Sequence, residues 1–263
     1  MIGVILAAGM AKRLRPLTDT KPKCLLEVGG RTLLERTVRA MQQAGITEFV
    51  VVTGYRGEQI RSFLETSLSS IPSLSSIPSS TSSTSDTSYT SPHFTFLHNA
   101  DYEHNNNIYS LWMAGEVVRG KDFLLMDSDI LCDPAAVVAI AQQEETALAL
   151  NRHECGEEEI KVIVDADNHI TEINKTCNPK DAIGESVGIE RFTSAYSTAL
   201  YQELDQMIVK EGLIDVFYER CFERLIPQGH TFKVVDTTNY FSYELDTPED
   251  FHRAQELIPA ELL

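Results

Sequence analysis

Apolar runs of strand length alternate along this chain with segments whose apolar residues have helical spacing. The first run, IGVILA (2–7), is short and continuous, which is typical of a strand buried on both faces of a sheet. The next segment, TLLERTVRAMQQAG (32–45), places its apolar residues on one side of a helix, and Gly45 is suited to end it. The alternation continues through strand-like runs at 48–53, 94–98, 122–131 and 146–151, and through helical segments at 56–65 and 109–118. It predicts an α/β fold with a doubly wound, mostly parallel sheet.

The second half of the sequence departs from this alternation. IKVIVDADNHITEINK (160–175) has two strand-like runs around the turn DADN, which predicts a β-hairpin. Later strands are expected at 186–192 and 232–236, with a helix at 197–212 between them. The final helix, TPEDFHRAQELI (247–258), opens with a capping threonine, a proline and two acidic residues. We therefore expect a single domain, 1–263, with a smaller β-hairpin-containing C-terminal elaboration.

Residues 67–92, SLSSIPSLSSIPSSTSSTSDTSYTSP, fit neither pattern. Serine, threonine and proline dominate this stretch, and it has too few large apolar side chains to offset the entropy lost on ordering. We expect a flexible surface insertion between a helix and the strand at 94–98. A phosphorylated or partner-binding segment is the alternative.

Charge and cysteine content exclude several classes of protein. The chain has 22 Lys and Arg against 39 Asp and Glu, a net charge of −17, which argues against a nucleic-acid binder or a binder of anionic membranes. Its five cysteines form no CxxC pair, which argues against a zinc site or a disulfide framework. No apolar stretch approaches the roughly 20 residues of a membrane span. These features predict a cytoplasmic protein without membrane insertion, and they leave the subunit count open.

A glycine-containing loop with basic residues follows the first predicted strand. It reads LAAGMAKRLRPLT (6–18), and a second basic stretch, TKPKCLLEVGG (20–30), comes directly afterwards. Open α/β sheets bind ligands at the carboxyl ends of their strands, and arginine and lysine side chains bind phosphate oxygens there. The loop lacks both the Walker sequence and the G-x-G-x-x-G dinucleotide fingerprint. A phosphate site of another kind is predicted, with a solvated loop as the alternative.

Two acidic motifs provide candidate metal ligands. LLMDSDIL places Asp127 and Asp129 at the end of a predicted strand, and YFSYELDTPED places Glu244 and Asp246 before the last helix. Carboxylates that face a polyphosphate suit Mg²⁺. Acidic residues also form turns and stabilise helix N-termini, and we interpret Asp127 as structural.

Together, LAAGMAKRLRPLT, KPKCLLEV, DSD and YELDTPED resemble the sugar-1-phosphate-type nucleotidyltransferase superfamily. The stretch NNNIYSLWMA (105–114) resembles the branch of bacterial choline-phosphate cytidylyltransferases. This resemblance covers the chain apart from 67–92. It implies a Rossmann-like fold and transfer of a nucleotidyl group from a nucleoside triphosphate, CTP in that branch, to a small phosphorylated or phosphonate acceptor. One departure concerns the loop, where Ala11 replaces the second glycine of the usual motif.

The resemblance also implies roles for individual residues. Arg13 would meet the triphosphate, and Lys23 would be the second catalytic residue, binding phosphate. The implied nucleotide-binding residues are Leu6, Ala8, Gly9, Asn107 and Ser110. The implied Mg²⁺ ligands are Asp129 and Asp246, assisted by Glu244, and Lys175 would reach the acceptor phosphate. Arg15 is expected to be structural or solvated.

The acceptor is open at this stage. Aromatic faces and carboxylates recognise quaternary ammonium groups, and the candidates are Tyr109, Trp112, Phe192, Tyr240 and Tyr243 with Glu185 and Glu190. Trp112 and Phe192 could equally belong to the core. We predict a Mg²⁺-dependent transfer of a cytidylyl group to phosphocholine or a similar alkylamine. The alternatives are 2-aminoethylphosphonate, inositol phosphate or a sugar 1-phosphate as acceptor, or a non-catalytic nucleotide-sensing subunit.

Overall fold

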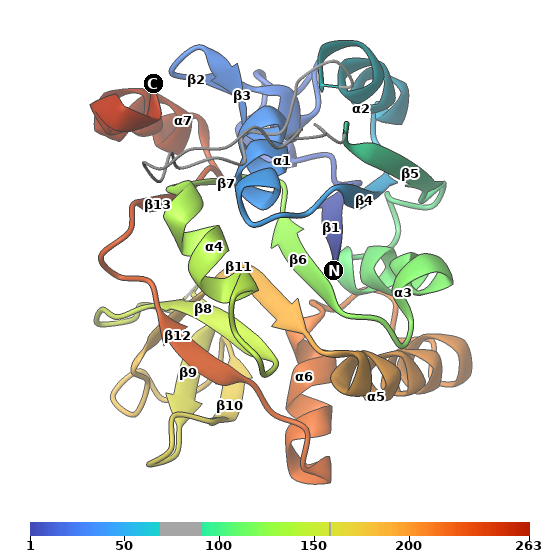
Figure 1. Ribbon diagram of the computed structural model, residues 1–263, viewed down its shortest axis with the longest axis vertical. Coiled ribbons are helices and arrows are strands. Elements are labelled where there is room, and N and C mark those ends of the chain that lie inside the picture. Colours follow the sequence, from blue (N-terminus) through green and yellow to red (C-terminus); the bar gives the residue numbers. More distant parts are fainter. Residues whose placement is uncertain (69–90, 158) are drawn as a thin grey trace, which may run out of the picture.

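The computed structural model describes residues 1–68, 91–157 and 159–263. Among these residues, a nine-stranded mixed sheet runs through the molecule in the order β10-β9-β11-β6-β1-β4-β5, with β8 beside β11 and β12 beside β8 (Figure 1). Helices cover both faces of this sheet. The predicted doubly wound α/β architecture is therefore confirmed. Of the Ser/Thr/Pro-rich segment, residues 69–90 lie outside the described residues.

Four parallel strands form the half of the sheet that carries the glycine-containing loop. β1 (Ile2–Ala7) lies between β4 (Glu48–Thr53) and β6 (Phe123–Asp127), and β5 (His93–His98) pairs with β4. All six residues of β1 are buried, as its continuous apolar run predicts. Because the strands are parallel, the segments after them meet at one edge of the sheet.

The other half of the sheet is mostly antiparallel. β11 (Gly184–Phe192) pairs with β6, with β8 (Ala147–Asn151) and with β9 (Lys161–Val164). β9 and β10 (Ile170–Asn174) form the predicted hairpin. β12 (Lys233–Asp236) runs parallel to β8. The long strand β11 therefore connects the hairpin to the parallel half.

The expected single strand at 122–131 is two strands. β6 ends at Asp127, and β7 (Ile130–Cys132) pairs with β13 (Ser242–Glu244) in a small separate sheet. The chain changes direction at Ser128 and Asp129. Here Asp127 and Asp129 interrupt the apolar run. This second pairing brings the segment with Glu244 next to the end of β6.

Each face of the sheet has its own apolar core. One core includes α3 (Asn107–Val118), α5 (Ser194–Leu204) and α6 (Glu219–Leu225). The opposite core includes α1 (Leu33–Gln43), α2 (Gly57–Phe63) and α4 (Pro134–Ala141). The sequence interpretation did not include α4 and α6. Asp133 caps α4, and Pro134 stands in its first turn, which is a local signal for a helix start.

The C-terminal helix α7 (Pro248–Leu257) packs near β2 (Glu27–Val28) and β3 (Arg31–Thr32), far from it in sequence (Figure 1). Thr247 caps the helix as predicted, and its side chain and that of Asp250 form a reciprocal capping box. Further short helical turns lie at 12–14, 23–25, 64–68, 205–210, 226–228 and 260–262. No helix in the described segments has both the length and the apolar content needed to cross a membrane.

Candidate functional site

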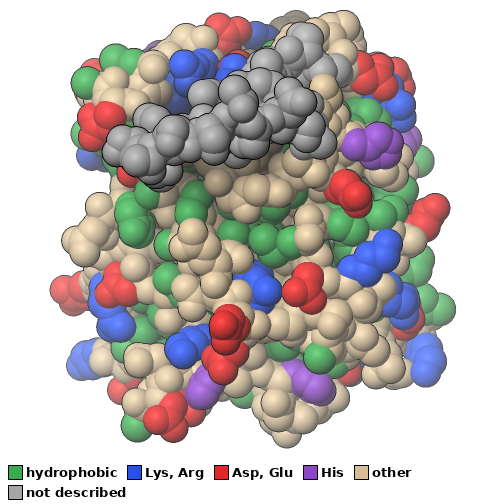
Figure 2. Space-filling model, in the orientation of Figure 1, with side chains coloured by type: hydrophobic (Ala, Val, Ile, Leu, Met, Phe, Trp, Pro, Cys, Tyr) green, Lys and Arg blue, Asp and Glu red, His purple; other side chains and the backbone are tan. Residues whose placement is uncertain are grey.

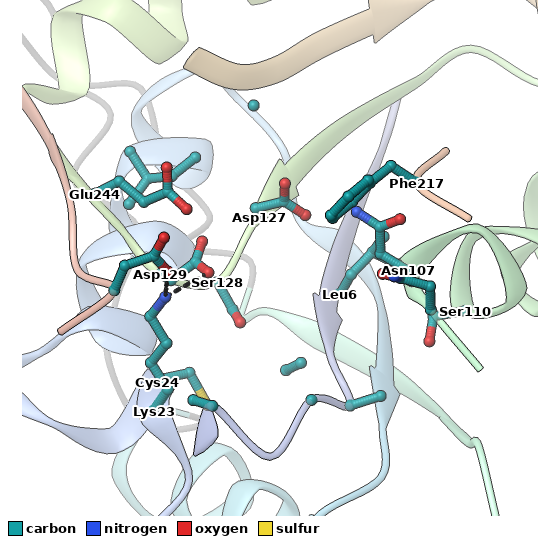
Figure 3. A pocket seen from close by; sticks show the side chains of 18 of the residues that line it. Leu6, Lys23, Cys24, Asn107, Ser110, Asp127, Ser128, Asp129, Phe217 and Glu244 are labelled. Atoms are coloured by element: carbon teal, nitrogen blue, oxygen red, sulfur yellow. Dashed lines mark hydrogen bonds and ion pairs between the residues drawn. The ribbon is translucent and has the colours of Figure 1, made fainter. Parts of the chain in front are cut away.

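A cavity of about 810 Å³ opens where the parallel strands end. Its walls come from the loop after β1, the turn around Lys23, the start of α3, the end of β6, and segments that precede α6 and α7 (Figure 3). On the molecular face drawn in Figure 2, acidic and basic side chains are interspersed and do not form one basic patch. The cavity is the place where the predicted phosphate, nucleotide and metal residues meet.

The loop after β1 has a left-handed backbone at Ala11, the position where the usual motif has its second glycine. Ala11 has φ 46° and ψ 54°, in the left-handed region that favours glycine. Thr18 Oγ1 donates a hydrogen bond to the Ala11 carbonyl oxygen at 3.0 Å, which holds the loop closed. A methyl group is therefore compatible with this turn, at a conformational cost. Leu6, Ala8 and Gly9 line the cavity.

Lys23 joins the two acidic motifs. Its Nζ lies 2.8 Å from Asp129 Oδ2 and 3.0 Å from Asp246 Oδ1. Arg13 Nη2 lies 2.6 Å from Asp246 Oδ2, so both predicted basic residues meet the same carboxylate. Burial alone would lower the pKa of Lys23, but the carboxylates of Asp129 and Asp246 outweigh it and raise that pKa. The lysine is a fixed cation at the centre of the site. Arg15 points elsewhere and pairs with Asp19 at the surface.

The predicted metal ligands form one cluster. Carboxylate oxygens of Asp129, Glu244 and Asp246 lie within 4.8 Å of one another. Partial burial of the Glu244 carboxylate and the charges of Asp129 and Asp246 raise its pKa to about 7, and Lys23 opposes this shift. A set of three carboxylates, only partly offset by the Lys23 ammonium, fits a hard divalent cation such as Mg²⁺.

Amide side chains line the cavity opposite the cluster. Asn107 and Ser110 lie there, on α3 (Figure 3). Buried Asn99 donates from Nδ2 to Asn105 Oδ1 at 2.8 Å and to Ser110 Oγ at 3.2 Å. Asn107 Oδ1 accepts a hydrogen bond from the backbone N–H of Tyr218 at 2.9 Å. The sequence interpretation missed Asn99 and Asn105, although a run of asparagines after a strand was a visible signal.

The predicted acceptor residues divide into two groups. Lys175 and Glu185 line the cavity, and Lys175 Nζ lies 4.9 Å from the centre of the Phe217 ring. The prediction for Phe192 is wrong, because this side chain is fully buried in the core and stacks on Phe123 at 4.4 Å. Phe192 ends β11, a strand inside the sheet, so its ring cannot reach a ligand.

Three other predicted aromatic residues lie outside the cavity wall. Trp112 donates from Nε1 to Asp205 at 2.9 Å and packs against Tyr109, with 5.3 Å between the ring centres. These contacts hold α3 against the segment after α5, and neither ring lines the cavity. Tyr240 is also absent from the wall, since its turn follows β12 on the far side of β8. The structure therefore corrects the prediction of an acceptor site built from Tyr109, Trp112 and Tyr240.

A cluster of acidic residues lies at the inner wall of the cavity, and the sequence did not predict that they would lie together. Asp127 and Glu219 line the cavity, and Glu190 is fully buried. Tyr218, whose ring is also fully buried, donates its hydroxyl hydrogen to Asp127 Oδ2 at 3.0 Å. Burial raises the pKa of Glu219 to about 7, and burial with the charges of Asp127 and Glu219 raises the pKa of Glu190 well above its ordinary value. The acceptor side of the cavity thus has an inner wall of buried carboxyl groups that the protein holds largely in their neutral form.

Lys161 supports the rim of this region from inside the protein. Its side chain is 1% exposed, and Nζ donates to the carbonyl oxygens of Lys175 at 2.6 Å, Glu157 at 3.1 Å and Glu159 at 3.3 Å. The ammonium ties the segment after β10 to the one before β9. Sequence patterns do not reveal such a buried lysine, because lysines are usually exposed.

Known proteins resemble this chain over most of its length. A family model described as a MobA-like NTP transferase domain matches residues 3–220. The CTP:phosphoglutamine cytidylyltransferase of Campylobacter jejuni is 24% identical over 263 residues, with 90% of this chain and 92% of that protein covered. The CMP-5'-(3-aminopropyl)phosphonate synthase of Streptomyces rubellomurinus is 24% identical over 261 residues, which cover 95% of this chain and 38% of that protein.

A solved structure shares the fold. CTP:phosphocholine cytidylyltransferase (LicC) from Streptococcus pneumoniae superposes with a TM-score of 0.75 at 19% identity, and the match covers 98% of this chain and 99% of that one. The predicted Rossmann-like nucleotidyltransferase fold is confirmed by this likeness. The family match extends from the first strand into α6 and includes the glycine-containing loop, Lys23 and Asp129. The chain therefore belongs to the MobA-like NTP transferase domain family, and it is a nucleotidyltransferase.

Proposed function

We propose that this protein transfers a cytidylyl group from CTP to phosphocholine or to a similar small phosphoalkylamine or phosphonoalkylamine, and releases pyrophosphate. One observation carries the proposal: Lys23 bridges Asp129 and Asp246 in an open cavity beside Arg13, with the glycine-containing loop next to them. This arrangement places cations and metal-binding carboxylates around one point, as transfer of a charged phosphoryl-type group requires. The choice of CTP is supported by relatives that are named for its use.

The reaction is an in-line displacement at the α-phosphorus of CTP. An acceptor phosphate oxygen forms the new P–O bond, the bond to the bridging β-phosphate oxygen breaks, and pyrophosphate leaves with the electron pair. Because the attacking phosphate is already anionic, catalysis needs positioning and charge neutralisation more than a general base. Arg13 and Lys23 balance the charge on the departing pyrophosphate, and the loop after β1 orients the nucleotide.

The metal site fits the same geometry. Asp129, Asp246 and Glu244 would hold Mg²⁺, and the ion when bound would neutralise the phosphate oxygens and hold them in place. Lys23 contacts both aspartates in the free protein and so occupies a position between carboxylates. When nucleotide and metal bind, the lysine ammonium remains near enough to contact a phosphate instead.

The acceptor end is proposed to bind a cationic head group. Lys175 lines the cavity and would meet the acceptor phosphate, while Glu185, Glu219 and Asp127 offer carboxyl groups that would bind an amine. His153 Nε2 lies 3.4 Å from Glu185 Oε2 and fixes that carboxylate. These substrates fit the cytoplasmic location that the sequence predicts.

A pyrophosphate-release screen tests this function. CTP, UTP, GTP, dTTP and ATP are each combined with phosphocholine, 2-aminoethylphosphonate, inositol phosphate and hexose 1-phosphates, with Mg²⁺ present and with reactions lacking acceptor as controls. We expect release with CTP and an amine-bearing acceptor. Release only with a hexose 1-phosphate or inositol phosphate would overturn the acceptor class. Tight binding of CTP without release in any reaction would indicate a nucleotide-sensing protein.

A further inference from the structure

The inner wall of the cavity has a carboxylate oxygen without a partner. Glu219 lines the cavity at the start of α6 and is 7% exposed, yet its Oε2 has no hydrogen-bond partner among the described residues. A buried acceptor without a donor is costly, so the Glu219 oxygen indicates a ligand that supplies a hydrogen.

Two described residues act on this wall. The Tyr218 hydroxyl donates to one oxygen of Asp127, and Lys175, whose ammonium lies over the Phe217 ring, is a cation whose charge acts on Glu219. Burial raises the pKa of Glu219, so the surroundings of this carboxyl group disfavour its ionised form. A ligand cation beside Glu219 would favour the ionised form and would also supply the hydrogen that its Oε2 lacks.

The position of this wall relative to the reaction centre is favourable. Figure 3 shows Asp127 between the Lys23–Asp129 pair on one side and Phe217 and Asn107 on the other. Asp127 and Asp129 are two residues apart at the end of β6. A short acceptor whose phosphate points to the reaction centre would therefore have its other end beside Asp127 and Glu219.

We propose, on the basis of the cytidylyl transfer proposed above, that the acceptor carries an ammonium with N–H groups, which it donates to Glu219 and Asp127. Glu190 is fully buried and does not touch the ligand. The acceptor is thus a primary alkylamine bearing a phosphate or phosphonate, in preference to its trimethylated form.

The aromatic content of the cavity supports this choice. Trimethylammonium groups have no N–H and are bound by aromatic faces. Tyr102 and Phe217 are the aromatic residues among the described wall residues, and Phe192, Trp112 and Tyr240 lie elsewhere. A trimethylated ligand would leave the Glu219 oxygen without a donor, and sites built for hydrogen bonding strongly reject ligands that lack the donor.

A series of acceptors that differ only in N-methylation tests the inference on the wild-type protein. Phosphoethanolamine, its N-methyl and N,N-dimethyl forms, and phosphocholine are compared at saturating CTP and Mg²⁺ by pyrophosphate release. We expect kcat/KM to fall along the series, by at least about 100-fold from the first to the last. A flat series, or a maximum at phosphocholine, would overturn the N–H assignment and leave cytidylyl transfer intact. Absence of release with every acceptor would overturn the proposed function and this inference with it.

The variant Glu219→Gln tests whether the Glu219 carboxylate causes the preference for a primary amine. The variant should lose much more activity on phosphoethanolamine than on phosphocholine, so the ratio of the two kcat/KM values should fall at least about tenfold. Glu116→Gln, at an exposed position on α3, is the matched control and should keep the wild-type ratio. An unchanged ratio in folded Glu219→Gln protein would contradict the role assigned to this residue.

Discussion

The Nζ atom of Lys23 lies 2.8 Å from Oδ2 of Asp129, although 106 positions separate the two residues in the sequence. The same ammonium contacts Asp246, so one cation holds both acidic motifs in the free protein. The lysine therefore occupies the position between carboxylates that the proposed metal ion would need. Metal binding and lysine position are coupled by this geometry.

Lys23→Met should separate the two effects of this lysine. We expect turnover to fall roughly 100-fold, because a charge that stabilises the departing pyrophosphate is removed. Affinity for Mn²⁺ without nucleotide should rise roughly tenfold, because the competing ammonium is gone. Titration of Mn²⁺ by electron paramagnetic resonance and pyrophosphate release give the two values. Lys121→Met, at an exposed position before β6, should leave both unchanged, whereas unaltered Mn²⁺ affinity in Lys23→Met would refute the competition.

Asp129→Ala should abolish turnover while the fold survives. Its carboxylate is a quarter exposed, so loss of its ion pair should lower the free energy of unfolding by only about 1 kcal/mol. Urea denaturation reports the stability, and pyrophosphate release reports the activity. Asp19→Ala, which removes an exposed partner of Arg15, is the control and should remain active. Normal turnover in folded Asp129→Ala would remove this residue from the metal site.

The raised pKa of Glu219 predicts that the stability of the protein depends on pH. Its pKa is about 7 in the folded protein because of burial, whereas a glutamate in an unfolded chain titrates near 4.3. Between these values the folded state holds a proton that the unfolded state releases. The contribution of Glu219 to the free energy of unfolding is therefore highest below about pH 4.3 and falls, by on the order of 3 kcal/mol, as the pH rises to about 7.

Glu219→Gln should flatten that dependence, because glutamine does not titrate. Urea midpoints at pH 5 and pH 8 in metal-free buffer measure it in the wild type, in Glu219→Gln and in Glu116→Gln. The last should behave as the wild type does. Equal slopes in the wild type and Glu219→Gln would show that Glu219 does not titrate in this range.

Ala11→Gly tests the conformation of the loop. Ala11 has a left-handed backbone, and glycine relieves the steric cost of its methyl group but gains freedom in the unfolded chain. The net result should be an increase of about 0.5–1 kcal/mol in the free energy of unfolding. Ala44→Gly, at φ −79°, should instead lower it by a similar amount. Thermal or urea unfolding decides between these signs, and destabilisation by Ala11→Gly would contradict the loop geometry.

Local patterns in the sequence predicted much of the fold correctly. The continuous apolar run of β1, the DADN turn of the β9–β10 hairpin and the Thr247 cap each depend on a few adjacent residues. Such signals predict elements well because burial, turn formation and capping are short-range requirements. The division of 122–131 into β6 and β7 could not be predicted in this way. The two aspartates in the apolar run do not show that the strand after them pairs with a different partner.

The acceptor side was less predictable because aromatic residues serve cores and binding sites alike. Phe192 and Trp112 have the same local sequence character as a ligand-binding aromatic, and only packing against Phe123 and Asp205 identifies their roles. The acidic wall was hidden for a related reason. Asp127, Glu190 and Glu219 come from three separate elements, and no spacing in the sequence connects them.

The sequence by itself predicted the parallel strands and the basic loop, and it indicated Arg13, Lys23, Asp129 and Asp246 as candidates, because each lies within a short, distinctive motif. The tertiary structure alone decided that these motifs meet. Pairing of β7 with β13 carries Glu244 and Asp246 to the end of β6, where Lys23 bridges the two aspartates. It also decided which side chains face the acceptor, since the direction of a side chain depends on strand register and helix packing across the whole chain.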